Sequence, residues 1–314
     1  MAIQLPDHLI QVLENGQRLR QQGYRGRFAP TPSGPLHLGN VRTALLSWLR
    51  ARLRNGQWLL RVDDLDTARI RSGAVESVLQ DLRWLGLHWD GPLVLQSKRR
   101  GLYSSFLSTM RTQGHLYPCR CSRRQLDGAT IYPGTCRRLD PDWGLREARL
   151  PAWRFRVAEP FATAVGDLVL RRADGVIAYH LATSIDEIAL GINEVVRGRD
   201  LEPVCAAQRA VITSFGIVSP RYGHVPLLCD ASGQKLSKRD HATGLNALRE
   251  RGETAAQVIG SHATSLGLVS STQAISASEL LEELRAREEK LTSLISEADS
   301  SEKVRDHRRE KASN

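Results

Sequence analysis

Hydrophobic positions along the chain follow two rhythms, one typical of helices and one typical of buried strands. Leu5, Leu9, Val12 and Leu13 recur at helical spacing and predict a helix over residues 5–22. Further helices are expected from Leu38 onward and over 71–86, 98–114, 205–217, 246–269 (one or two helices) and within 278–295. Apolar or alternating runs predict strands near 24–30, over 58–66 and across 155–198, with Asp-Gly at a hairpin turn.

The alternation of strands and helices predicts an α/β protein of the Rossmann type, with a mainly parallel sheet covered on both faces. A stretch rich in Cys, Arg and Gly over 115–150 interrupts that alternation and indicates an inserted subdomain. The expected divisions are an N-terminal helical extension (1–23), the first Rossmann half (24–114), the insertion (115–175), the second half (176–245), a short helical region (246–275) and a charged, partly disordered tail (276–314).

Composition points to a polyanionic partner. The chain has 314 residues and a formal net charge of +10, which favours RNA or DNA over a membrane as the partner. No apolar stretch reaches the roughly 18 residues that a membrane span needs. Residues 1–23 contain Asp7 and Glu14, so they do not form a secretory signal, and a cytoplasmic protein is expected. An odd count of five cysteines argues against a disulfide framework.

The string HLGN at 37–40 follows a Pro- and Gly-rich loop and opens a predicted helix. A helix N-terminus offers unpaired N–H groups and partial positive charge, which together favour a phosphate. Gly34 and Gly39 let the backbone approach a ligand closely, and His37 can donate a hydrogen bond to a phosphate oxygen.

The string KLSKR at 235–239 lies in a polar Gly/Ser loop after an apolar run. Lys235 and Lys238 are three residues apart, so a closing loop could bring both cations to the phosphates during group transfer. Two such strings, far apart and in this order, predict one nucleotide site built from both halves of the fold.

The two strings resemble the signatures of class I aminoacyl-tRNA synthetases, usually written HIGH and KMSKS, and RFAPTPSGPLHLGN resembles the glutamyl/glutaminyl subgroup. Leu38, Asn40, Leu236 and Arg239 depart from the signature letters. The resemblance implies a class I synthetase catalytic core, with magnesium accompanying ATP. It implies catalytic roles for His37, Lys235 and Lys238, and ATP binding by His37, Gly39, Asn40, Lys235, Ser237 and Lys238.

A substrate carboxylate in a partly dry pocket needs a fixed cation, and the fork of an arginine pairs with it in two places. Arg27 precedes the nucleotide loop and Arg197 ends a predicted strand; the resemblance implies that both hold the side-chain carboxylate of glutamate. The implied glutamate site consists of Arg27, Phe28, Ala29, Pro30, Thr31, Asp63, Tyr179 and Arg197. Asp63 stands where the family usually has Glu, as the partner of the substrate ammonium, directly or through water, and Thr183 stands where the family commonly has Asn.

Cys119, Cys121 and Cys136 lie within one short segment and predict a structural zinc, one per chain, which needs a fourth ligand. His115 is the obvious candidate from its chemistry. Shortened relatives of glutamyl-tRNA synthetases have a similar cysteine pattern with a tyrosine ligand, and this resemblance implies Tyr132.

Only residues 240–314 follow the lysine-rich loop, so no anticodon-binding domain is expected. Over about 24–270 the chain resembles those shortened relatives of glutamyl-tRNA synthetases. This resemblance implies activation of L-glutamate with ATP and transfer to the queuosine base at the wobble position of tRNA(Asp). The protein is expected to act as a monomer, without a membrane partner.

Three other functions stay open from the sequence. A truncated glutamyl-tRNA synthetase would charge a tRNA 3′ end, although the missing anticodon domain and Thr183 argue against it. A non-catalytic tRNA-binding paralogue is disfavoured because it would not need His37, Arg27, Lys235 and Lys238 to be intact. An unrelated nucleotidyltransferase with the same two strings is disfavoured by the cysteine-rich insertion and the basic charge.

Overall fold

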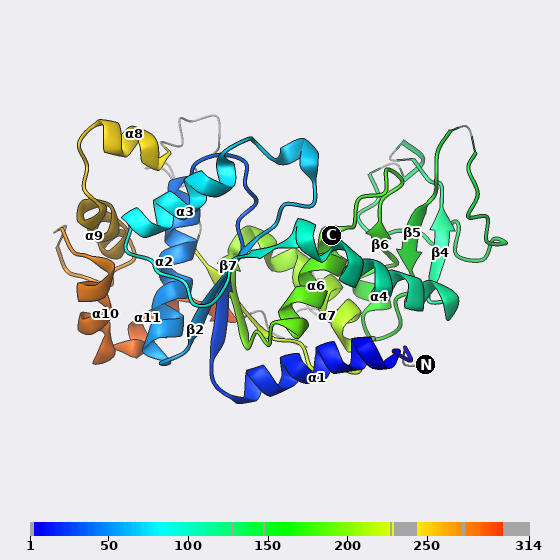
Figure 1. The fold of residues 1–314 in the computed structure, drawn as a ribbon, viewed down its shortest axis with the longest axis horizontal. Coiled ribbons are helices and arrows are strands. Elements are labelled where there is room, and N and C mark those ends of the chain that lie inside the picture. The colour runs from blue at the N-terminus through cyan, green and yellow to red at the C-terminus, as the bar shows by residue number, and fades with distance from the viewer. Residues whose placement is uncertain are drawn as a thin grey trace, which may run out of the picture.

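The structure is a computed structural model that describes residues 3–122, 124–126, 128–146, 148–226, 228, 244–271 and 274–297. Its centre is a set of parallel strands: β1 (Arg25–Phe28), β2 (Gln57–Val62) and β3 (Val94–Leu95) pair in that order, and β7 (Glu194–Gly198) pairs with β8 (Arg221–Val225). β1 lies beside β7, and Asn193 N donates to the carbonyl oxygen of Arg25 at 2.9 Å. The predicted Rossmann-type α/β architecture is confirmed (Figure 1).

Helices cover both faces of this sheet (Figure 1). One layer holds α2 (Leu38–Leu53), α3 (Ala74–Trp84), α8 (Leu245–Glu250), α9 (Ala255–Ser265), α10 (Ala277–Arg285) and α11 (Glu288–Leu294). The other holds α1 (Asp7–Gln21), α4 (Arg100–Thr112), α6 (Tyr179–Ala189) and α7 (Cys205–Thr213). Short helices are η1 (Thr67–Arg69), η2 (Gln96–Arg99), η3 (Arg124–Leu126), α5 (Ala162–Val165) and η4 (Arg199–Val204). None of the helices in the described part of the chain is long and apolar enough to cross a membrane.

The two faces of the sheet differ in chemistry, because successive strand residues point to opposite sides. Trp58 and Leu60 of β2 pack into the apolar layer around α2. On the other face, β1, β2 and β7 each contribute one buried arginine: Arg27, Arg61 and Arg197. Three neighbouring strands therefore direct buried cations toward the side covered by α6 and α7.

Helix α6 corrects one prediction, because residues 179–189 were expected to belong to a strand. Every residue from Leu181 to Ala189 is buried, so the segment has no exposed polar face from which helical spacing could be recognised. Asp186 and Glu187 lie within this buried run and meet the arginines of the sheet.

The insertion forms a separate antiparallel sheet of β4 (Leu116–Cys119), β5 (Ala152–Phe155) and β6 (Leu168–Arg171). The predicted Asp-Gly turn is confirmed: Arg172 N donates to the carbonyl oxygen of Val176 at 2.9 Å, and Gly175 takes a φ of 87°. This sheet lies at one end of the molecule, and α8–α11 lie at the other (Figure 1).

Both terminal regions pack onto the core. Helix α1 approaches α6 so closely that a Cβ on Gly16 would lie 1.9 Å from the carbonyl oxygen of Ile188. At the other end, the single helix expected within 278–295 is two helices, α10 and α11, followed by β9 (Ser296–Glu297), which pairs antiparallel with β8. The expected disorder of 298–314 lies outside the described residues.

Candidate active site and metal centre

The first signature string forms the start of α2, next to the carboxyl ends of β1 and β2. His37 is the residue before the helix, and its Nδ1 accepts from Asn40 N at 3.2 Å. A neutral ring that accepts at Nδ1 carries its proton on Nε2, so Nε2 is the nitrogen able to donate to a phosphate. A Cβ on Gly39 would lie 3.0 Å from the His37 ring, so the glycine lets the ring sit against the first helical turn.

The second string lies outside the described residues, and so do Lys235, Ser237 and Lys238. Its flank is described. Gly244 forms an antiparallel bridge with His37, and Leu245 N donates to the carbonyl oxygen of Leu36 at 3.2 Å. The start of α8 and the residue before it therefore lie directly against the HLGN loop.

Asp81 of α3 ties these two segments together. It is fully buried, its Oδ2 accepts from Leu36 N at 2.8 Å, and its Oδ1 forms an ion pair with Arg249 Nη2 of α8 at 2.9 Å. Burial raises the pKa of Asp81 above its ordinary value, although the Leu36 N–H and Arg249 oppose this. The carboxylate thus fixes the residue before His37 and the helix that follows the KLSKR segment.

We expect Asp81→Ala to raise the KM for ATP about 10-fold or more, because a buried N–H and a guanidinium lose their partner at a cost of roughly 1–3 kcal/mol. The measurement is pyrophosphate exchange at varied ATP. Glu76→Ala, which removes an exposed acid from the same helix, should leave this KM unchanged. An unchanged KM for ATP in a folded Asp81→Ala protein would show that the anchor does not shape the nucleotide loop.

Two of the buried arginines are neutralised by the acids of α6. Arg27 Nε donates to Glu187 Oε1 at 3.0 Å, and Arg61 Nη1 donates to the same oxygen at 3.4 Å. Arg61 Nε also lies 3.7 Å from Asp186 Oδ2. Glu187 is fully buried, and its carboxylate is stabilised there by arginines from two neighbouring strands. The charge of Arg27 is therefore already shared with Glu187.

Asp63 lies immediately after β2 and is held by the same network. Arg61 donates to its two oxygens, from Nε at 2.7 Å and from Nη2 at 3.2 Å. Burial raises the pKa of Asp63 above its ordinary value, and Arg61 opposes this. Asp63 N donates to the carbonyl oxygen of Pro30 at 3.0 Å, which joins the end of β2 to the loop after β1.

The other predicted residues of this loop play different parts. Thr31 is exposed and Ala29 is half-buried. The Phe28 ring packs against Trp58 on the apolar face, with ring centroids 6.1 Å apart. Phe28 can therefore border the substrate site only with its backbone.

Arg197 differs from the other two arginines because its hydrogen-bond partners are neutral. Nη1 donates to Gln208 Oε1 at 2.8 Å, Nη2 donates to Cys205 Sγ at 2.9 Å, and the guanidinium carbon lies 4.8 Å from the centre of the Tyr222 ring. The side chain is 3% exposed. Arg197 therefore carries a buried positive charge for which the described residues provide no ion pair.

The start of α6 borders this charge. Tyr179, which is 37% exposed, begins the helix and lies close enough to Arg197 to influence its pKa. Thr183, one turn later, is fully buried, and its Oγ1 has no hydrogen-bond partner among the described residues. A buried hydroxyl without a partner is uncommon in proteins, so Thr183 joins Arg197 as a candidate contact for a polar ligand.

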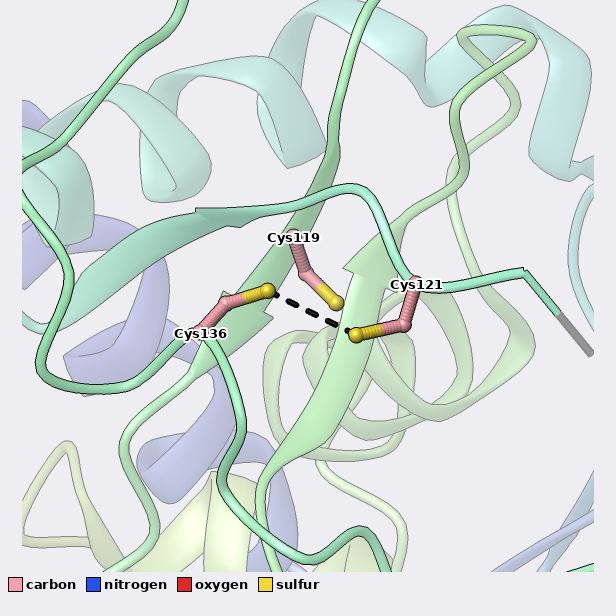
Figure 2. Close-up of side chains that lie close together, drawn as sticks. All are labelled: Cys119, Cys121 and Cys136. Carbon is pink, nitrogen blue, oxygen red and sulfur yellow. Dashed lines mark hydrogen bonds between the residues drawn. The ribbon is translucent and has the colours of Figure 1, made fainter. Parts of the chain in front are cut away.

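The three predicted cysteine ligands come together in the insertion. Cys119 at the end of β4, Cys121 and Cys136 place their sulfur atoms within 4.8 Å of one another, and the side chains point toward a common centre (Figure 2). The Cys121 and Cys136 sulfurs are 3.5 Å apart. Sulfur ligands of a tetrahedral zinc lie about 3.8 Å apart when Zn–S is about 2.3 Å, so the cluster fits that ion.

Tyr132 lies at the same centre. Its Oη is 3.5 Å from Cys119 Sγ and 3.6 Å from Cys121 Sγ, and it accepts from Cys136 N at 2.8 Å. His115 contributes no ring nitrogen to the cluster of potential ligands in the described part of the chain. Arg154 donates from Nε to Cys119 Sγ at 3.2 Å, and its guanidinium carbon lies 3.6 Å from the Tyr132 ring centre, so a cation faces the sulfur-rich cluster.

The sequence and fold of known proteins match this arrangement. The model of the class I tRNA synthetase (E and Q) catalytic domain matches residues 24–130 and 154–260. A glutamyl-Q tRNA(Asp) synthetase of Prochlorococcus marinus (strain MIT 9303) is 58% identical over 93% of this chain and 98% of its own. A glutamyl-Q tRNA(Asp) synthetase of Nocardia farcinica is 44% identical over 78% and 86%. The chain belongs to the class I glutamyl and glutaminyl tRNA synthetase family.

Solved members of this synthetase family share the fold. The glutamate-tRNA synthetase from Elizabethkingia anophelis superposes with a TM-score of 0.69 at 27% identity, covering 83% of this chain and 65% of the other. The present chain is thus shorter than that synthetase. The family match covers Cys119 and Cys121 but omits 131–153, which contains Tyr132 and Cys136, so only part of the predicted metal site lies within it.

Sequence reasoning missed several residues of this synthetase site: Arg61, Asp81, Asp186, Glu187, Cys205, Gln208 and Tyr222. Asp186 and Glu187 offered a usable signal, because two acids inside the apolar run LATSIDEIALG require buried cationic partners. Gln208 offered none, because a glutamine in a helix is ordinarily a surface residue. Cys205 is buried, and its Sγ accepts a hydrogen bond from Arg197 Nη2.

Proposed function

We propose that this chain activates L-glutamate with ATP and transfers the glutamyl group to the queuosine base at the wobble position of tRNA(Asp). The observation that carries the proposal is Arg197, a buried cation whose hydrogen-bond partners are neutral, in a core of the glutamyl/glutaminyl type. A glutamate side chain would supply the missing carboxylate, whereas a neutral glutamine would leave the charge unpaired.

In the activation step, an oxygen of the substrate α-carboxylate attacks the α-phosphorus of ATP. A new P–O bond forms, the bond to the β-phosphate bridge breaks, and pyrophosphate leaves with that electron pair. The enzyme needs no covalent nucleophile for this displacement, because positioning and neutralisation of the developing charge lower the barrier.

Different residues would bind the phosphates of ATP and the ammonium group of the substrate. His37, Gly39 and Asn40 at the start of α2 would hold the phosphates, and Lys235, Ser237 and Lys238 would approach them from the KLSKR segment. Magnesium bound to ATP would neutralise part of the phosphate charge. Asp63 would receive the substrate ammonium; because Arg61 holds its oxygens back toward β2, a bridging water is compatible with the shorter side chain.

In the transfer step, the acceptor atom of the modified base attacks the acyl carbon and AMP leaves. The relatives that cover nearly all of this chain are named glutamyl-Q tRNA(Asp) synthetases, which supports this acceptor over a tRNA 3′ end. Bases of RNA loops can be splayed out and bound individually, so a small core can reach one. Since its substrates would be tRNA and ATP, we expect the protein to act in the cytoplasm, as a monomer.

We further propose that Cys119, Cys121, Cys136 and Tyr132 bind one structural zinc. The sulfur spacing and the position of the Tyr132 Oη support this ligand set. Zinc would supply a tetrahedral crosslink to an insertion with little apolar core of its own.

The deciding experiment incubates the protein with ATP and labelled glutamate, and then with tRNA(Asp) that carries or lacks queuosine. We expect label only on the queuosine-containing tRNA, and retention of that label after periodate oxidation of the 3′ end beforehand. Label on tRNA(Glu) that disappears after periodate treatment would establish a truncated glutamyl-tRNA synthetase instead. A protein that binds tRNA but never activates glutamate would be a non-catalytic paralogue.

A further inference from the structure

The guanidinium of Arg197 is held by one turn of α7. Cys205 and Gln208 are three residues apart, so they share a face of the helix, and each accepts from one terminal nitrogen of the arginine. The Tyr222 ring lies against the same guanidinium. Arg197 is therefore fixed at both ends of its fork before any substrate arrives.

The choice of a neutral acceptor has a chemical consequence. Arg27 and Arg61 meet the carboxylates of α6, and their charge is shared within the protein. Gln208 offers an amide oxygen that orients Arg197 without neutralising it. A glutamate at the same position would reach the same nitrogen, form a buried ion pair and compete with the substrate carboxylate.

The side-chain amide of Gln208 also has a donor that lacks an acceptor among the described residues. The residue is fully buried, and its Nε2 has no hydrogen-bond partner among the described residues. A buried donor without an acceptor is costly, and a ligand that brings carboxylate oxygens to this side chain would relieve the cost. Burial and the orphan donor both indicate that this side chain serves a bound anion rather than the packing of α7.

We propose that Gln208, supported by Cys205, is the positioning residue that keeps Arg197 both fixed and electrically unpaired, and thereby sets the preference for glutamate over glutamine. This inference rests on the proposed function. Its sharpest variant is Gln208→Glu, which preserves shape and reach, gives the acceptor a negative charge and replaces the Nε2 donor by an oxygen. Gln208→Met preserves the length and removes the strong acceptor.

The test measures the KM for L-glutamate and the inhibition constant of L-glutamine in ATP–pyrophosphate exchange. For Gln208→Glu we expect a KM for glutamate about 100-fold higher and an inhibition constant for glutamine within about 5-fold of the unaltered protein, because only the charged ligand loses its partner. For Gln208→Met we expect a KM for glutamate about 10-fold higher with kcat within about 3-fold.

Ser184→Ala is the matched control, since the Ser184 hydroxyl donates to the backbone oxygen of Gln208 at 3.4 Å in the same buried interface without contacting the guanidinium. It should leave both constants nearly unchanged. The inference fails if Gln208→Glu weakens glutamate and glutamine by the same factor, as a merely damaged pocket would.

The inference on Gln208 also fails if the KM of Gln208→Met for glutamate equals that of the unaltered protein. If Gln208→Glu does not fold, the Gln208→Met variant alone tests the inference. If the unaltered protein shows no glutamate-dependent ATP–pyrophosphate exchange, the proposed function itself is wrong.

Discussion

Arg197→Ala is expected to lower kcat/KM for glutamate activation by about 30-fold or more. Removing one member of a buried charge pair typically costs 2–5 kcal/mol, and each 1.4 kcal/mol is tenfold in affinity. Of the three buried arginines on this face of the sheet, Arg197 is the one whose described hydrogen-bond partners are neutral. Arg27 and Arg61 already pair with acids of α6, so they would not replace Arg197 as the partner of the substrate carboxylate. The measurement is glutamate-dependent ATP–pyrophosphate exchange with purified protein.

Arg197→Lys refines this result. Lysine keeps the charge but loses the planar fork that contacts Gln208 and Cys205 together, so we expect a smaller loss that falls mainly on the KM for glutamate. Arg18→Ala removes an exposed arginine from the last turn of α1 and should not change activity. Full activity of a folded Arg197→Ala protein would contradict the assignment of this residue to the substrate carboxylate.

The prediction of α2 from sequence succeeded for a local reason. Pro and Gly before Leu38 end the preceding segment, His37 provides a ring nitrogen for the first turn, and the apolar spacing then begins. The three cysteines were also predictable, because short spacing alone forces their side chains into one region. Both predictions depend on residues that are close in the sequence.

The failures involve partners that are distant in the sequence. Helix α6 is buried on all sides from Leu181 onward, so its pattern resembles a buried strand, and its acids are stabilised by arginines more than 100 residues earlier. β9 pairs with β8 across about 70 residues and carries no signal of its own. The role of Gln208 likewise depends on the fold that places α7 over β7.

Loss of the metal is expected to have the largest effect on stability. Burial opposes ionisation of the Cys136 and Cys121 thiols: hydrogen bonds from Tyr132 and the Arg120 backbone still lower the pKa of Cys136, whereas the pKa of Cys121 is raised to about 11. Zinc binds thiolates, so its binding would have to displace the proton of Cys121. We expect Cys136→Ser to reduce bound zinc from one atom per chain to none and to lower the Tm by about 5–10 °C, since a structural zinc contributes several kcal/mol to folding and about 1 kcal/mol shifts the Tm of a 314-residue chain by roughly 1–2 °C.

Chelation of the unaltered protein should reproduce that shift, and zinc measured by elemental analysis gives a readout independent of activity. Ser122→Ala, beside Cys121 but hydrogen-bonded to Gln125, is the matched control and should retain the metal. An equal Tm with and without zinc would contradict a structural role.

Tyr132→Phe then identifies the fourth ligand. In the unaltered protein, the Tyr132 Oη lies within 3.6 Å of two of the sulfur atoms, whereas His115 is not part of the cluster among the described residues. Removing a single oxygen should therefore weaken zinc binding about 10- to 100-fold in competition with a chromogenic chelator, while His115→Ala should bind zinc as tightly as the unaltered protein. The reverse order of the two variants would assign the fourth position to the histidine, which would require the backbone before β4 to move toward the sulfurs when the metal binds.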